Sequence, residues 1–196
     1  MLETYSFMHP GNKPEYIDSI IVGYAGYTMC GMVDGRVNSA KAPLISSAIK
    51  NIMKSAVDGS DFASVLDNIN EEVYQIAKKD ASYMIIRLSD NDVEINKYGD
   101  FNCYLIRNGE ILDIPNGKLS LLDDDRMLFC TSTFITYLNR EAILADSLTS
   151  ISSEEWIQYL VARISDANML MCDNLTALAI IVRQSDDDMR FDRLFV

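Results

Sequence analysis

The stretch CDNLTALAIIV, residues 172–182, has the pattern of a buried strand that begins with two polar residues. From Leu175 to Val182 it is a nearly continuous apolar run of the length that buried strands have. Asp173 and Asn174 stand directly before this run. Both residue types favour turns, because their side chains bond to the local backbone. Taken alone, the pair is equally compatible with a turn and with a functional carboxylate at the end of a strand.

The composition is that of an ordinary globular protein. The chain has 196 residues, of which 48% are hydrophobic, and a chain of this length buries about 70% of its unfolded surface on folding. No apolar run reaches the roughly 18 residues of a membrane helix. The first residues, MLETYSFMHPGNK, lack the apolar core of a signal peptide. We therefore expect a single cytoplasmic domain over residues 1–196, with 1–12 and 184–196 as candidate loose ends.

Charge and cysteine usage exclude several classes of function. The formal net charge is −12, from 17 basic and 29 acidic residues, with no basic stripe, so we expect neither a nucleic-acid nor a membrane partner. The only histidine is His9, which argues against a zinc site and against catalysis by a Ser-His-Asp or Cys-His arrangement. The cysteines show no CxxC spacing and are expected to be buried thiols in a reducing compartment. They are Cys30, Cys103, Cys130 and Cys172.

Hydrophobic periodicity predicts strands and helices in blocks, not in strict alternation. After an irregular segment over residues 1–16, it predicts two strands within residues 18–35 and two helices, followed by a meander with an Asn108-Gly109 hairpin. A polar loop is expected near residues 116–117. The helices are expected at 41–56, 61–78, 133–146 and 152–169, and the later strands at 81–89, 93–98, 101–107, 110–114, 126–132 and 175–182. This order indicates an α+β fold.

Three acidic residues lie at the ends of predicted strands. Asp18 stands directly before SIIV, Asp34 directly after TMCGMV, and Asp173 directly before its strand. Carboxylates on strand ends can converge at one rim, where a hard divalent cation would neutralise them. Gly35 permits a backbone carbonyl to approach closely, and two such metals can activate a water for attack on phosphorus. The alternative is a turn at each position, although a helix, and not a paired strand, is predicted after Asp34-Gly35.

These residues, in this order, resemble the PPM family of metal-dependent protein phosphatases, also called type 2C protein phosphatases. The resemblance runs from about Lys13 to Val182. It includes Lys13 five positions before Asp18, the segment MVDG, the segment KYGDFNCYLIRNGEI at 97–111, and DNLT at 173–176. It implies a four-layer αββα sandwich, in which two antiparallel sheets are flanked by helix pairs.

The resemblance also implies a site and a reaction. Asp34 would bridge two Mn²⁺ or Mg²⁺ ions, the Gly35 carbonyl would bind one of them, and Asp173 the other, with Asp18 at the same rim. A metal-bound hydroxide would attack phosphoserine or phosphothreonine in a phosphorylated protein. Lys13 would hold the phosphate as a point charge, without the bidentate fork of arginine.

The sequence departs from the family pattern at several of these positions. Ser132 stands where the family has a metal-binding acid, and Ile17 where an additional acid often precedes the first Asp. Arg36 and VNSA replace a glycine-rich stretch, and Arg36 is a candidate phosphate ligand. The connection from EILDIP to RMLFC is also short. These departures point to weaker metal binding and to low or absent activity.

Three hypotheses follow. The first is a metal-dependent protein serine/threonine phosphatase of low activity. The second is a pseudophosphatase, which is the same fold acting as a phosphoprotein-binding or regulatory module without catalysis. The third is an N-terminal-nucleophile hydrolase, which shares the αββα layering and would need a processed nucleophile such as Thr4.

Overall fold

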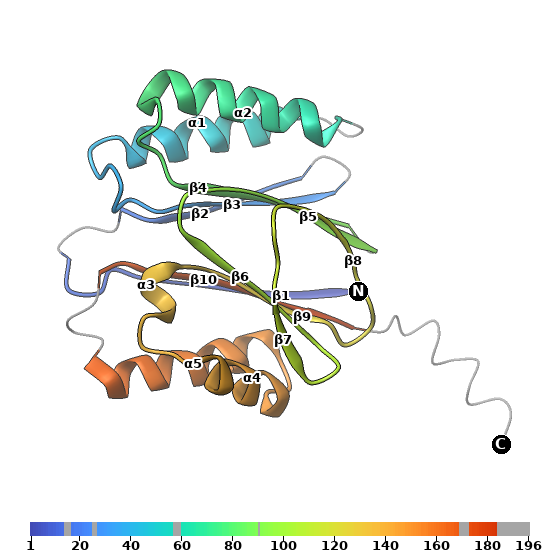
Figure 1. The fold of residues 1–196 in the computed structure, drawn as a ribbon. Coiled ribbons are helices and arrows are strands. Elements are labelled where there is room, and N and C mark those ends of the chain that lie inside the picture. The colour runs from blue at the N-terminus through green and yellow to red at the C-terminus, as the bar shows by residue number, and fades with distance from the viewer. Residues whose placement is uncertain (14–16, 25–26, 57–59, 90, 169–172, 184–196) are drawn as a thin grey trace, which may run out of the picture.

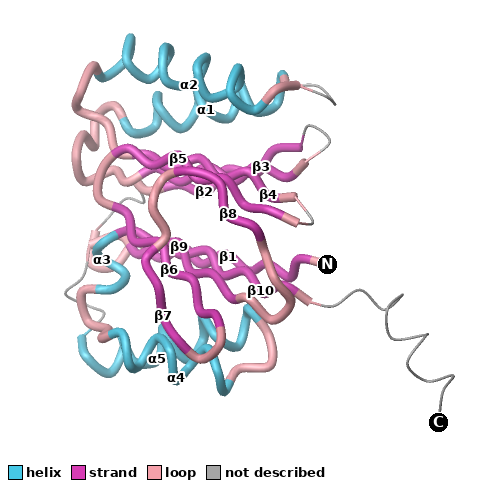
Figure 2. The backbone as a smooth tube through the Cα atoms, turned by 45° about the vertical axis from the view of Figure 1, so that its right-hand side comes forward, coloured by secondary structure: helices cyan, strands magenta, loops and turns pink. Residues whose placement is uncertain are grey.

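The computed structural model describes residues 1–13, 17–24, 27–56, 60–89, 91–168 and 173–183. Two five-stranded antiparallel sheets pack face to face, and helices cover the outer face of each (Figure 1). The expected four-layer αββα arrangement is therefore confirmed. The tube drawn in Figure 2 shows the same layers from a second direction, with the two sheets stacked between the helices.

The first sheet has the strand order β1-β10-β9-β6-β7, and all of its pairings are antiparallel. Its strands are β1 (Leu2–His9), β6 (Phe101–Arg107), β7 (Glu110–Asp113), β9 (Arg126–Thr131) and β10 (Leu175–Val182). Every residue of β10 is buried, because this strand has a neighbour on each side and is covered on both faces. That position explains the continuous apolar run of the quoted stretch.

The second sheet has the strand order β2-β3-β4-β5-β8, again with antiparallel pairings. Its strands are β2 (Ser19–Tyr24), β3 (Thr28–Val33), β4 (Tyr83–Leu88), β5 (Asp92–Tyr98) and β8 (Gly117–Ser120). The chain crosses between the sheets after β5, so β6 and β7 join the first sheet before β8 returns to the second.

Two helix groups cover the outer faces (Figure 1). The helices α1 (Ala42–Ser55) and α2 (Phe62–Ala77) lie on the second sheet, and α3 (Ser132–Ile135), α4 (Arg140–Thr149) and α5 (Ser153–Asn168) lie on the first. Asp61 caps α2, since its side chain accepts a hydrogen bond from the Ser64 backbone N–H. Of the helices in the described ranges, none is long and apolar enough to cross a membrane.

Side-chain alternation along the strands divides the core into three layers. The middle layer lies between the sheets and contains Met32, Met84, Phe129 and Leu178, all buried. The outer layers lie between each sheet and its helices. The middle layer depends on both sheets, so it fixes how their ends are placed relative to each other.

The structure differs from the sequence-based expectations at three places. The expectation of an irregular segment over 1–16 is wrong for β1, which pairs along its whole length with β10, from Leu2 opposite Val182 to His9 opposite Leu175. Its local sequence is only half apolar, and pairing with the buried β10 decides its conformation. The expected polar loop near 116–117 leads into the short, largely exposed strand β8. The single helix expected at 133–146 is two helices, α3 and α4.

Candidate functional site

The middle layer turns from apolar to polar at one end of the sandwich. This is the end where β3 leads toward α1 and β9 leads into α3, on the left in Figure 1. At this end, five strands have a last apolar side chain that points between the sheets. Two positions farther toward the end, in or just outside each strand, a buried polar side chain lies on the same face. These side chains are Asp18 beyond Ile20, Asp34 beyond Met32, Ser82 beyond Met84, Thr131 beyond Phe129, and Thr176 beyond Leu178. The strand ends thus gather polar groups from both sheets.

Asp18 links the two sheets at this end. One carboxylate oxygen accepts a hydrogen bond from the Gly35 N–H at 2.9 Å, and the other accepts one from the Thr176 hydroxyl at 2.8 Å. Burial raises the pKa of Asp18 from 3.8 to about 6, these two hydrogen bonds oppose the rise, and the nearby Asp34 charge adds to it. Asp18 is therefore a carboxyl group that loses its proton reluctantly.

Asp34 is paired with an arginine two residues along the chain. The Arg36 Nε lies 3.1 Å from each Asp34 oxygen, the Arg36 Nη2 lies 2.7 Å from Oδ2, and the Arg36 backbone N–H donates to Oδ1 at 2.9 Å. The hydrogen bond to Asp34 raises the pKa of Arg36, as do the charges of Asp34, Asp100 and Asp18, against desolvation. Both oxygens of the buried carboxylate thus contact one guanidinium group.

Ser132 meets the same guanidinium from the other sheet. Its hydroxyl accepts a hydrogen bond from Arg36 Nη2, the nitrogen that also donates to Asp34 Oδ2. Ser132 is the first residue of α3, directly after β9. Asp34 and Ser132 therefore lie on two sides of one positively charged nitrogen.

Asp173 and Asn174 lie at the start of β10 and have different roles. The Asp173 Oδ2 lies 3.8 Å from the Lys13 Nζ, and its Oδ1 accepts the Asn174 N–H at 2.8 Å. The Asn174 side chain accepts the N–H groups of Ile17 and Asp18 at 2.6 and 3.1 Å. Asn174 thereby fixes the segment that carries Asp18, a role that the sequence interpretation missed although it singled out the Asp-Asn pair.

Gly35 is required by packing. A Cβ at this position would lie 2.6 Å from the carbonyl oxygen and from the Cγ1 of Ile17, closer than such atoms approach. The sequence interpretation attributed the glycine to a carbonyl that approaches a metal. The structure gives a second reason, the close passage of the chain before Asp18.

The donor set does not fit the dinuclear metal site that the resemblance implies. Within the described ranges, no group of three or more His, Cys, Asp or Glu side chains is placed to hold a metal ion. Both oxygens of Asp34 contact Arg36, and the position expected to supply another carboxylate supplies a neutral hydroxyl, from Ser132, to the same arginine. Asp18 and Asp34 act on each other by charge, whereas Asp173 contacts Lys13 and Asn174. A guanidinium group already pairs with Asp34.

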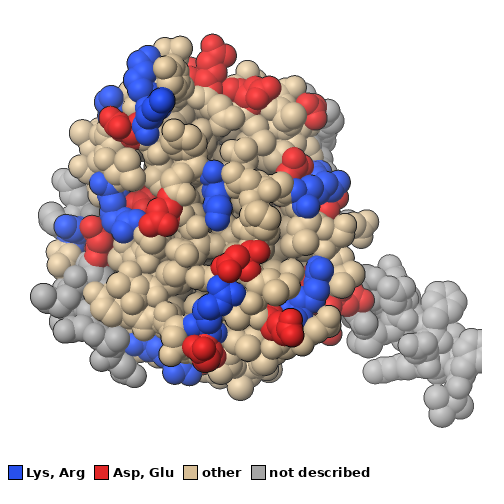
Figure 3. All heavy atoms as spheres, in the orientation of Figure 1, with Lys and Arg blue, Asp and Glu red and all other residues tan. Residues whose placement is uncertain are grey.

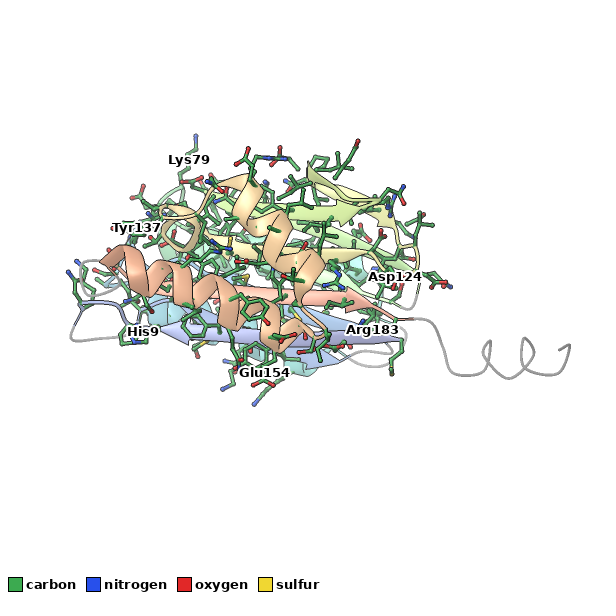
Figure 4. The ribbon with its side chains drawn as sticks, turned by 90° about the horizontal axis from the view of Figure 1, so that it is seen from below. His9, Lys79, Asp124, Tyr137, Glu154 and Arg183 are labelled. Atoms are coloured by element: carbon green, nitrogen blue, oxygen red, sulfur yellow. The ribbon has the colours of Figure 1, made fainter. Side chains whose placement is uncertain are left out.

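The two remaining candidates, His9 and Thr4, both belong to β1. His9 accepts a hydrogen bond from the Gly11 N–H at 3.0 Å and stacks on Phe7. In Figure 4 it lies at the same end of the molecule as Tyr137, whereas Asp124 and Arg183 lie at the opposite end. Thr4 lies within β1 opposite Ile180, away from a strand start.

The cysteines follow the sequence expectation where they are described. Cys30, Cys103 and Cys130 are free and buried, and burial raises the pKa of each thiol. Cys172 lies outside the described residues. On the face shown in Figure 3, acidic and basic side chains are interspersed and form no extended basic patch.

The architecture matches solved structures of bacterial serine/threonine phosphatases. The Mycobacterium tuberculosis phosphatase PstP/Ppp shares 17% identity at a TM-score of 0.73, over 93% of this chain and 99% of that one. The S. agalactiae serine/threonine phosphatase shares 13% identity at a TM-score of 0.77, over 93% and 100%. RsbX in complex with magnesium shares 16% identity at a TM-score of 0.71, over 92% and 94%.

These likenesses define the fold. A PstP catalytic-domain structure that matches this chain contains two manganese ions. No protein-family model matches the sequence, and no curated protein matches it. The chain therefore has the fold of the PPM-type serine/threonine phosphatases, at a sequence identity of 13–17% to the solved structures.

Proposed function

We propose that the protein is a PPM-fold regulatory module that binds a phosphorylated protein without efficient hydrolysis. The observation that carries this proposal is Ser132. Where the resemblance expects a carboxylate, a neutral hydroxyl accepts a hydrogen bond from Arg36. Hard divalent cations take carboxylates as their main charged ligands. A serine at this position therefore offers no negative charge to the ion that would activate the nucleophile.

The cations at the rim are the proposed contacts for the phosphoryl group. The side chains of Lys13 and Arg36 are 49% and 34% exposed, so each presents part of its charge to solvent. Each is also close to a carboxylate, from Asp173 and Asp34 respectively. A phosphate would share these cations with the protein's own acids, so we expect weak, salt-sensitive phosphate contacts and a larger contribution from the partner's surrounding surface.

An assay with phosphoserine and phosphothreonine peptides in millimolar Mn²⁺ tests the proposal. We expect no turnover above that of Asp34→Asn, because the carboxylate is already neutralised. Fluorescence polarisation of the same peptides, phosphorylated and unphosphorylated, measures recognition. Manganese-dependent turnover that disappears in Asp34→Asn would overturn the proposal.

The second candidate function is metal-dependent phosphatase activity at a low rate. It is favoured by the presence of Asp18, Asp34, Gly35 and Asp173, the acids and glycine that the resemblance assigns to the metal rim. Mg²⁺ keeps several waters and is often held by only one or two carboxylates, so the set is not too small in principle. This candidate requires turnover to depend on Asp173 as well as Asp34, which Asp173→Asn in the same assay decides.

A further inference from the structure

Arg36 supplies Asp34 with the contacts that a bound cation would supply. Its Nε and Nη2 lie 2.7–3.1 Å from the carboxylate oxygens, and the same Nη2 also donates to Ser132. The positive charge at Nη2 therefore contacts Asp34, which follows β3 of one sheet, and Ser132, which follows β9 of the other. The guanidinium thus supplies positive charge to the two positions from which the resemblance expects metal ligands.

The Asp34 side chain is closed to solvent, whereas Arg36 is partly exposed. The Asp34 side chain is 1% exposed and the Arg36 side chain 34%, and the side chain and backbone N–H of Arg36 both donate to the Asp34 carboxylate. Arginine keeps its charge at every pH relevant to a folded protein. A hydrated Mg²⁺ or Mn²⁺ would have to displace this group and lose waters to reach Asp34.

The surroundings of Arg36 carry more acid than one cation neutralises. Asp18, Asp34 and Asp100 all act on its charge. In addition, the hydroxyls of Ser82 and Thr131, 1% and 0% exposed, have no hydrogen-bond partner among the described residues. Both occupy inward positions of the polar end, beside Asp34 and Ser132 in the chain or in the sheet. Buried oxygens without partners are what a water or ion in this end would satisfy.

We infer that Arg36 is a built-in cation that blocks a latent divalent-cation site between residues 34 and 132. The inference rests on the proposed function, because it assumes that the wild-type site works without metal. It adds a physical cause. Arg36 supplies a positive charge beside Asp34, and position 132 lacks the negative charge that would attract a metal ion instead. In Ser132→Asp, the new carboxylate would pair with Arg36. In Arg36→Met, Asp34 would be the only carboxylate of the two positions. Both changes together recreate the cation site.

Four proteins test this inference with Mn²⁺ as the probe: the wild type, Arg36→Met, Ser132→Asp and the double variant Arg36→Met/Ser132→Asp. Titration calorimetry and the EPR signal of free Mn²⁺ report binding without any activity assay. We expect saturable binding in the double variant and none in the wild type or Ser132→Asp at the same concentrations. At 100 times the dissociation constant, the double variant should melt about 5–10 °C higher than without metal.

Matched controls separate a restored site from a general effect of lost positive charge. Arg107→Met removes another arginine that holds a buried carboxylate, that of Asp125, and should gain no Mn²⁺ binding. Adding Asp34→Asn to the double variant should abolish binding. If the double variant is unfolded without metal, refolding in Mn²⁺ must recover the native circular dichroism spectrum.

The outcomes distinguish this inference from the proposed function. A folded Arg36→Met/Ser132→Asp that binds no Mn²⁺, or an unfolded one that Mn²⁺ does not recover, overturns the inference and leaves the proposed function standing. Wild-type binding as tight as that of the double variant also overturns it. Manganese-dependent phosphopeptide turnover by the wild type overturns the proposed function and, with it, the assumption that the site works without metal.

Discussion

Two buried aspartates in this molecule are each held by one arginine, and their surroundings differ. Asp34 pairs with Arg36 at 2.7 Å, and Asp125 pairs with Arg107 at 2.6 Å. Both carboxylate side chains are 1% exposed, and the arginines are 34% and 22% exposed. By contact geometry alone, the two pairs would be assigned the same role.

The neighbours of each pair separate them. The Asp125 carboxylate also accepts the Leu122 N–H at 2.7 Å, and Arg107 donates to the Ser120 carbonyl at 2.9 Å. That pair holds the turn after β8 against β6. The Asp34–Arg36 pair instead faces further acids, including Asp18. The comparison teaches that two pairs with the same contacts and burial differ in the number of acids that act on the arginine.

The largest expected effect is that of Arg36→Met. It leaves the buried Asp34 with only the backbone N–H of residue 36 as a donor and close to Asp18, so we expect a loss of about 3–5 kcal/mol in the free energy of unfolding at pH 7, the range for breaking a buried pair. Urea denaturation measures it. Because the penalty comes from an unpaired charge, adding Asp34→Asn should recover part of the loss.

Arg107→Met is the comparison for this result. Both carboxylates keep one backbone N–H donor, from Leu122 for Asp125 and from residue 36 for Asp34. Among the described residues, Asp125 is the only acid whose charge raises the pKa of Arg107, so the loss should be smaller than that for Arg36→Met. Equal losses, with equal recovery in Arg107→Met/Asp125→Asn, would mean that surplus acid at the Asp34 end has no energetic consequence.

The second prediction concerns pH and Asp18. The folded protein raises the pKa of this carboxyl from 3.8 to about 6, so between these values the folded state holds a proton that the unfolded chain has released. Stability due to Asp18 therefore falls as pH rises through this window and is constant above it. Two pKa units correspond to about 3 kcal/mol. Relative to Asp18→Asn, the wild type should lose about this much stability between about pH 3.5 and 7.

Other carboxylates titrate in the same range, so only the difference between the wild type and Asp18→Asn isolates this group. Urea denaturation of both proteins across the window supplies that difference. A difference that is flat with pH, or that favours the wild type as pH rises, would show that the hydrogen bonds from Gly35 and Thr176 outweigh burial.

The third prediction concerns Asn174. Its side-chain oxygen accepts two backbone N–H groups, and its amide donates to the Pro10 carbonyl at 3.0 Å. Asn174→Ala leaves the N–H groups of Ile17 and Asp18 without this partner, and we expect a loss of about 2 kcal/mol. Thermal denaturation measures it, and a loss below about 0.5 kcal/mol would mean that water replaces the amide at no cost.

Much of the fold could be predicted from the sequence because local signals agree with it. Asn108 and Gly109 have φ of +54° and +76°, as the hairpin expectation requires, and the apolar run of β10 reports a strand covered on both faces. The strand β1 could not be predicted in the same way. Its half-apolar sequence becomes a strand through pairing with β10, about 170 residues away, and no local pattern records that partner.

The candidate site was likewise predictable only where a local sequence signal exists. Asp18, Asp34 and Asp173 could be named because acids at strand ends are visible in sequence. That Arg36 would turn back onto Asp34 and reach Ser132, 96 residues away, depends on how two sheets stack. The inward polar residues Ser82 and Thr131 also carry no motif. Alternation from the adjacent apolar strands was the one signal that could have found them.

The smallest expected effect belongs to a third arginine–aspartate pair, which tests whether pairing alone matters. Arg140 Nη1 lies 2.9 Å from an Asp113 oxygen, nearly as close as the 2.7 and 2.6 Å of the buried pairs, but the two side chains are 43% and 73% exposed. Water screens this pair, so Arg140→Ala should cost about 1 kcal/mol or less, including its contact with the Tyr104 ring. Urea denaturation at low and high salt measures it, with Asp113→Ala as the matched variant. A loss comparable to that of Arg36→Met would show that contact geometry outweighs burial and surplus charge, and would remove the distinction between the Asp34 and Asp125 ends of the molecule.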